Sequence, residues 1–199
     1  MHCNGPIIRP QTDADSIFIE VTVGCTHNKC TFCNFYEGYP FSVAPLKNIT
    51  VADILEGCKR LEKAGVNYRM IYLGGMAGKG KGKESAHKTA EVLNELHPYY
   101  LYLNMVNVIP GTELYREKEA GLFVEEEERE RLTEFITLLG EMKNEIRVFA
   151  APNTTNFSFD IDLQSEKEYV VSEMIKIRDN MTDEQELRYK RYREARKAV

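Results

Sequence analysis

Stretches of hydrophobic residues with two different periods alternate along the chain and predict an α/β protein. Residues 16–23 read SIFIEVTV, a run of β-branched and aromatic residues that ends at Gly24 and predicts a strand. Further strands are predicted at 68–73, 101–108 and 146–151, with a short one at 157–161. Helical periodicity predicts helices from Asn48 or Thr50 to Ala64, and over 84–96, 124–143, 166–180 and 183–198. Strands that alternate with helices indicate βαβ units and a mostly parallel sheet.

Three segments carry more specific expectations. In the first helix Cys58 shares a helical face with apolar residues and is predicted to be a small core residue. The acidic run 125–130 (EEEERE) near a helix start is predicted to form a solvated face. The basic stretch 188–197 reads as an exposed amphipathic terminal helix, with contact to a polyanion such as tRNA as the alternative.

The composition limits the classes of protein that need to be considered. The chain has 199 residues, of which 43% are hydrophobic, and it carries 31 acidic against 26 basic side chains. These values suit one domain, with a core at 1–165 and a helical extension of it at 166–199. A net charge of −5 argues against nucleic acid as a partner, and no apolar run is long enough to cross a membrane. Residues 1–10 lack the apolar core of a signal peptide, so we expect a cytoplasmic protein.

Three of the five cysteines, Cys25, Cys30 and Cys33, fall within nine residues of a polar loop that follows the first predicted strand. Three thiolates can hold three corners of a metal centre and leave one coordination position open for a small molecule. No further cysteine follows Cys33 within 20 residues, which argues against a four-cysteine site. A zinc site that uses His27 as the fourth ligand, or three unliganded core cysteines, are the alternatives.

The segment from Gly24 to Cys33, GCTHNKCTFC, resembles the signature of the radical SAM superfamily. That signature is a strand followed by three cysteines, with two residues between the last two and an aromatic residue, here Phe32, before the final one. Four residues rather than the commonest three separate Cys25 from Cys30, as in branches of the superfamily with similar text. The resemblance implies a [4Fe–4S] cluster on the three cysteines. It also implies S-adenosylmethionine on the fourth iron, cleaved to a 5′-deoxyadenosyl radical.

The same resemblance implies roles for residues outside the loop. Phe32 would pack beside the adenine, and Gly74 and Gly75 would lie along the methionine moiety of the cofactor. Asn107, on the segment 104–108, would lie near the adenine. The resemblance further implies an electron donor such as a flavodoxin or ferredoxin. The glycine-lysine run 74–83 lacks the spacing of a phosphate-binding loop, so a flexible solvated loop is the favoured interpretation.

The middle of the chain departs from the family pattern. Members normally carry several more βα units, and the usual Gly-Gly-Glu element is absent or has Met76 in place of its acid. We therefore expect an incomplete or open parallel (β/α) barrel of the radical SAM type with four to five strands. Three outcomes are open: a compact sheet that still works, a homodimer that completes the site, or a remnant that binds a cluster without turnover. A structural zinc protein is a weaker hypothesis.

Overall fold

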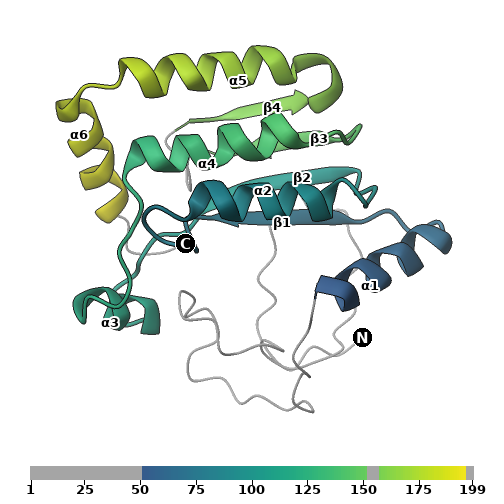
Figure 1. The fold of residues 1–199 in the computed structure, drawn as a ribbon, viewed down its shortest axis with the longest axis horizontal. Coiled ribbons are helices and arrows are strands. Elements are labelled where there is room, and N and C mark those ends of the chain that lie inside the picture. The colour runs from purple at the N-terminus through teal and green to yellow at the C-terminus, as the bar shows by residue number, and fades with distance from the viewer. Residues whose placement is uncertain (1–50, 152–156, 196–199) are drawn as a thin grey trace, which may run out of the picture.

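The computed structural model of the chain describes residues 51–151 and 157–195, and these form an open α/β sheet covered by helices on one face (Figure 1). The sheet has the order β1-β2-β3-β4. Strands β1 (Arg69–Gly74), β2 (Tyr100–Met105) and β3 (Arg147–Ala150) run parallel, and β4 (Phe159–Asp162) pairs antiparallel to β3. The predicted α/β class and the open, mostly parallel sheet are confirmed. The strand predicted at 16–23 lies outside the described residues.

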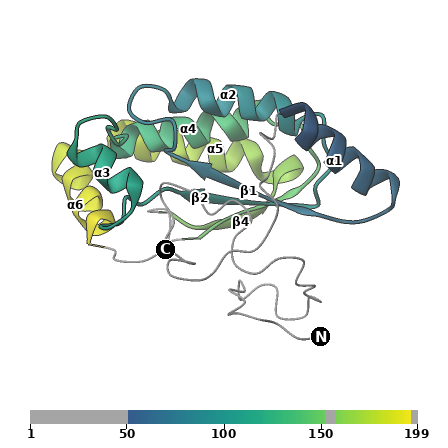
Figure 2. The same cartoon turned by 90° about the horizontal axis from the view of Figure 1, so that it is seen from below.

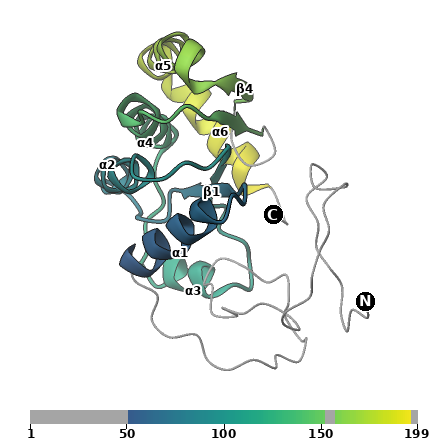
Figure 3. The same cartoon turned by 90° about the vertical axis from the view of Figure 1, so that its right-hand side faces the viewer.

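Helices α2 (Gly82–Leu93), α4 (Glu128–Glu141) and α5 (Leu163–Asn180) lie side by side over one face of the sheet (Figures 2 and 3). Successive strand residues point to opposite faces, so every second residue of each strand faces these helices. The inward residues are almost all apolar, and with the helix residues that meet them they form one core. It includes Leu101, Leu103, Val148, Phe135 and Leu138.

Helix α1 (Val51–Lys63) precedes β1 and ends where the sequence predicts. The N–H of Val66 donates to the carbonyl of Leu61 at 3.0 Å across Gly65, whose φ of 69° suits glycine. The apolar face of the helix is largely solvent-exposed, with Ile54 43% exposed. Cys58 is half-buried and does not belong to the core of the described residues, so its predicted core role is corrected.

The predicted helix 124–143 begins later than expected, and a further short helix precedes it. Helix α3 (Glu113–Glu119) follows β2. Its N-cap is Thr112, whose hydroxyl accepts a hydrogen bond from the N–H of Tyr115. Residues 124–127 are not helical, because Glu127 is the N-cap of α4 and exchanges hydrogen bonds with Glu130 in a capping box. Strands β1 and β2 end on the side of the molecule where α3 lies (Figure 1).

The last helix, α6 (Asp183–Glu194), follows α5 after Thr182, which forms a capping box with Gln185. It lies on the same side of the molecule as α3 (Figure 2). Within the described residues, no helix has both the length and the apolar character needed to cross a membrane.

Candidate functional site

The ends of β1 and β2 bring three predicted site residues, Gly74, Gly75 and Asn107, into one region. The N–H of Val106 donates to the carbonyl of Gly74 at 2.9 Å, and a Cβ on Gly75 would lie 3.1 Å from Val106 Cγ1. Asn107 follows Val106 directly. Ligand sites of open α/β sheets gather at the carboxyl ends of parallel strands, so this is the edge at which a site is expected.

The packing and backbone conformation at the end of β1 require glycine at positions 74 and 75. A Cβ on Gly74 would lie 2.8 Å from Met105 Sδ and 3.0 Å from Phe135 Cε1, so the absence of a side chain lets β2 and α4 approach. Gly75 has a φ of 79° and turns the chain out of the strand. Its N–H donates to Glu134 Oε2 at 2.8 Å, so a side chain of α4 fixes this turn.

Glu134, which holds this glycine turn, and Glu126 are both buried acidic residues, and each is 1% exposed. The hydroxyl of Tyr72 donates to Glu134 Oε1 at 2.5 Å. Glu126 lies against the start of α2, where a Cβ on Gly82 would come within 1.9 Å of its Oε1. Burial, followed by the charge and hydrogen bond of Glu134, raises the pKa of Glu126 to about 8.

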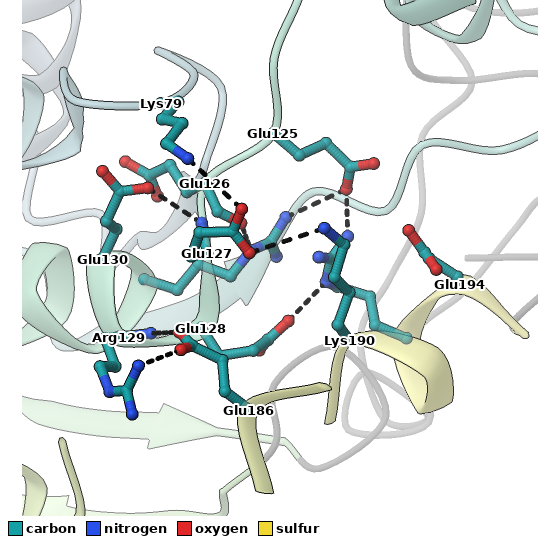
Figure 4. Close-up of polar contacts among 12 residues, drawn as sticks. Lys79, Glu125, Glu126, Glu127, Glu128, Arg129, Glu130, Glu186, Lys190 and Glu194 are labelled. Atoms are coloured by element: carbon teal, nitrogen blue, oxygen red, sulfur yellow. Dashed lines mark hydrogen bonds and ion pairs between the residues drawn. The ribbon is translucent and has the colours of Figure 1, made fainter. Parts of the chain in front are cut away.

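A second group of buried charges joins α4, α6 and the segment before α4 (Figure 4). Arg193 Nε donates to Glu128 Oε1 at 2.9 Å, and Arg193 Nη1 also bonds Glu125. Lys118 lies 2.5 Å from the other oxygen of Glu125. Burial alone would raise the pKa of Glu125, but the cations of Arg193, Lys118 and Arg131 outweigh it and lower that pKa.

Arg131 of α4 connects this charge group to the glycine turn. Its Nη1 donates to the carbonyl of Val106 at 3.2 Å, and its Nε donates to the carbonyl of Glu126 at 3.3 Å. Burial, and then the positive charge of Arg193, lower the pKa of Arg131. The guanidinium therefore ties the end of β2 to the segment that carries the acidic run.

Asn107 provides an unused acceptor at this edge. The residue is 7% exposed, and its Oδ1 has no hydrogen-bond partner among the residues that the structure describes. A buried amide oxygen without a donor costs about 1–3 kcal/mol, so a group that donates a hydrogen bond to it at this strand end is stabilising. It can accept a hydrogen bond from an amino or hydroxyl group of a small molecule.

The face of the sheet away from α2, α4 and α5 carries a row of aromatic residues. Tyr100 and Tyr102 have ring centroids 4.8 Å apart, and Tyr102 meets Phe149 edge-on at 5.9 Å. Arg147 contacts the carboxylate of Asp160 through two hydrogen bonds, which lowers the pKa of that carboxyl. Ile71 on the same face is 66% exposed. This face presents planar rings and polar groups to whatever covers it.

The predicted cluster residues Cys25, Cys30 and Cys33 and their neighbour Phe32 lie outside the described residues. In residues 51–151 and 157–195, no three His, Cys, Asp or Glu side chains gather as a metal site. The glycine-lysine run is better anchored than expected. The N–H of Lys79 donates to the carbonyl of Val124 at 2.8 Å, and Lys79 Nζ pairs with Glu127 at 3.4 Å.

One sequence expectation about charge is wrong. The acidic run is not a solvated face, because Glu126 and Glu128 are buried and Glu125 bonds three cations. The expected exposed terminal helix is present as α6, whose residues are mostly exposed, although Arg193 on it is 4% exposed. The sequence does carry a signal for part of this burial: Arg131, Glu134 and Phe135 share the helical spacing of the core-facing side of α4, so two charged residues stand at core positions.

Comparisons with known proteins do not assign this chain to a family. No protein-family model matches the chain, and no curated protein matches it. One solved structure with a similar chain is the archaeal Methanocaldococcus infernus Elp3 with an N-terminal deletion (1-46). The TM-score is 0.43 at 16% identity, over 68% of this chain and 32% of that chain. This chain thus spans about a third of that protein's length, and we draw no functional argument from the likeness.

Proposed function

We propose that the chain is a radical SAM-type protein that binds a [4Fe–4S] cluster through Cys25, Cys30 and Cys33 and uses S-adenosylmethionine. The observation that carries the proposal is the cysteine segment itself. It has a two-residue gap before the last cysteine, Phe32 in the aromatic place, and a predicted strand directly before it. Reductive cleavage of the sulfonium to methionine and a 5′-deoxyadenosyl radical is the chemistry that cluster and cofactor supply together when bound.

The topology of the described sheet supports this proposal. The predicted strand 16–23 precedes α1, and α1 precedes β1, which is the order of a βαβ unit. In such a unit the two strands run parallel and the crossover is right-handed in nearly all cases. If strand 16–23 pairs in this way in the sheet, its carboxyl end, where the cysteines follow, faces the same edge as Gly75 and Asn107.

The residues at that edge fit a cofactor with a free amino group and an adenine. The Oδ1 of Asn107 is a buried acceptor without a donor among the described residues, and it can receive an amine hydrogen. The N–H of Gly75 is already donated to Glu134, and the Gly75 carbonyl accepts from the N–H of Gly78, so Gly75 can offer a ligand only the second lone pair of its carbonyl oxygen. Gly75 therefore suits the ammonium of the methionine moiety and not its carboxylate.

The open sheet favours a second candidate function, an iron–sulfur or interaction protein derived from the same family that does not cleave the cofactor. The described parallel strands end at an antiparallel edge strand, β4, so β1–β4 do not form a barrel wall. A radical needs an enclosure that excludes water and other hydrogen donors. A second copy of the chain is one means of supplying it, and an electron donor such as a flavodoxin or ferredoxin belongs only to the first candidate.

The deciding experiment is anaerobic reconstitution of the full chain with iron and sulfide, followed by EPR of the dithionite-reduced protein with and without S-adenosylmethionine. We expect a cluster signal that changes when the cofactor is added, together with formation of 5′-deoxyadenosine. A cluster signal that does not respond supports the second candidate. Stoichiometric zinc and no cluster would overturn both in favour of a zinc site.

Variants of single cysteines sharpen this test. Cys25→Ala, Cys30→Ala and Cys33→Ala should each lose most of the iron and labile sulfide, because a three-thiolate site has no spare ligand. Cys58→Ala is the matched control, since Cys58 lies half-buried on α1 and should leave the iron content unchanged. Full iron content in the Cys33→Ala variant would contradict the proposal.

A further inference from the structure

The carbonyl of Val106 lies where the ladder between β1 and β2 ends, directly before Asn107. Val106 is 2% exposed, and its N–H donates to the carbonyl of Gly74 at 2.9 Å. In a continuing parallel ladder, the carbonyl of Val106 would accept its hydrogen bond from the residues that follow Gly74. Gly75, with a φ of 79°, turns the chain away at this point. The buried carbonyl therefore needs a donor from another element.

Arg131 of α4 supplies that donor. Its Nη1 donates to the carbonyl of Val106 at 3.2 Å, and a Cβ on Gly75 would lie 3.6 Å from its Nη2. The arginine is 3% exposed, so this hydrogen bond is shielded from water, where an unpaired carbonyl is most costly. The guanidinium thus lies against the ends of both strands, at the edge formed by Gly75, Val106 and Asn107. We call these three residues the ligand edge.

The other nitrogens of Arg131 are held by groups outside the sheet. Its Nε donates to the carbonyl of Glu126 at 3.3 Å, and its Nη2 lies 3.5 Å from Glu125 Oε2. Glu125 is in turn paired with Lys118 of α3 at 2.5 Å and with Arg193 of α6. Because each of its three nitrogens has a partner, the plane of the Arg131 guanidinium is fixed. This arrangement suits a side chain that supports the strand end rather than one that binds a ligand itself.

We propose that Arg131 is a positioning residue for the ligand edge, because it holds the carbonyl of Val106 and thereby orients the backbone of Asn107. The carbonyl of Val106 and the N–H of Asn107 belong to one planar peptide unit, so a hydrogen bond to the first orients the second. The backbone from which the Asn107 amide extends is then fixed, and its buried Oδ1 meets a small molecule from a defined position. The hold on β2 is independent of the cysteines, whereas its effect on cofactor binding rests on the proposed function.

The first test is NMR of the full chain without cofactor, with carbon-13 and nitrogen-15 in the backbone. Arg131→Lys keeps the positive charge, but an ammonium cannot match the planar fork that reaches three partners. We expect the carbonyl carbon of Val106 and the amide nitrogen of Asn107 to shift, because both respond to the hydrogen bond that this carbonyl accepts. Arg129→Lys on the same helix is the matched control. It should leave both signals in place, because Arg129 bonds side chains of α6.

Unchanged Val106 and Asn107 signals in Arg131→Lys would overturn the proposal. Equal shifts in Arg129→Lys would overturn it too, because they would trace the change to a loosened α6 and not to the lost hydrogen bond. If Arg131→Lys does not fold, the wild type decides the question. We then expect nuclear Overhauser contacts between the guanidinium protons of Arg131 and the α-protons of Gly75, and a freely rotating guanidinium without them would contradict the proposal.

The second test is binding of S-adenosylmethionine to the full chain after reconstitution with iron and sulfide. We expect Arg131→Lys to weaken binding by about tenfold, and Arg129→Lys by less than about twofold, because only the first removes a support of the ligand edge. The iron content should be the same in both variants, since the cysteines are untouched. Equal affinities for Arg131→Lys and the wild type would overturn the role of Arg131 at the ligand edge. A wild type that does not bind the cofactor would count against the proposed function alone, and the NMR test then decides this inference.

Discussion

At the scale of single residues, the turn at Gly74 and Gly75 depends on the lack of a Cβ atom at these two positions. Gly74 at the end of β1 faces α4, and Met105 of β2 and Phe135 of α4 leave room there for a hydrogen atom but not for a Cβ. Glycine within a strand normally weakens it, so its presence at the last residue of β1 has to be explained by a close approach. Here the approach brings Glu134 of the same helix within reach of Gly75.

This packing predicts that Gly74→Ala destabilises the protein by about 1–3 kcal/mol, because an added methyl group in a well-packed core forces its neighbours to move. Met105 is flexible, but the ring of Phe135 at 3.0 Å is not. Urea unfolding of the two chains measures the difference.

Gly57→Ala is the control for that measurement. Gly57 lies in the exposed helix α1, where a Cβ would meet nothing within 4 Å. Alanine there should stabilise the helix by about 0.5–1 kcal/mol. An equal change in the free energy of unfolding for both variants would show that Gly74 is not tightly packed.

At the scale of elements, α2 and α4 are held together by one histidine at the surface as well as by the core. His87 on α2 has Nδ1 2.6 Å from Glu141 on α4 and Nε2 3.6 Å from Glu91. The hydrogen bond and charge of Glu141 raise the pKa of His87. The clasp is therefore strongest when the imidazole is protonated.

The sign of the pH dependence follows from this shift. Because the pKa of folded His87 lies above its ordinary value of 6.5, its contribution is fully present below pH 6.5 and is lost as the pH rises through the raised pKa. We expect His87→Gln to show a smaller loss of stability between pH 6 and pH 8.5 than the wild type, measured by thermal unfolding at each pH. Glu141→Gln should reduce the loss in the same way, and an unchanged profile in both variants would refute the clasp.

The sequence predicted helices and strands better than the contacts between them. The end of α1 was predictable because Gly65 is a local signal that needs no tertiary partner. The late start of α4 was not predictable, because the capping box of Glu127 and Glu130 lies inside an acidic run, and acidic residues suit several positions near a helix start. The short helix α3 was not predicted either. Burial of Glu126, Glu134 and Arg131 depends on which cations and donors the fold brings near them, and it was not predicted from the sequence.

At the scale of the whole molecule, α6 is joined to the rest by charge more than by apolar packing. Arg193 is its one buried residue in the described helix, and it bonds Glu125 and Glu128. Arg129 of α4 adds contacts to Glu186 and to Asp183, the latter at 2.9 Å. Glu125, before α4, and Glu128, within α4, are thus paired with a cation from α6, the last described helix.

This arrangement predicts that Arg193→Ala costs about 3–5 kcal/mol, because it leaves two buried carboxylates without their main counter-charge. Arg191, exposed on the same helix, is the matched control, and Arg191→Ala should change the free energy of unfolding by less than about 0.5 kcal/mol. Adding Glu128→Gln to Arg193→Ala should restore part of the loss, because the amide does not carry the uncompensated charge, whereas Glu125 keeps Lys118 and Arg131 as partners. Urea unfolding of the four chains at pH 7 tests this, and a double variant no more stable than Arg193→Ala would show that the arginine does not act on Glu128 through its charge.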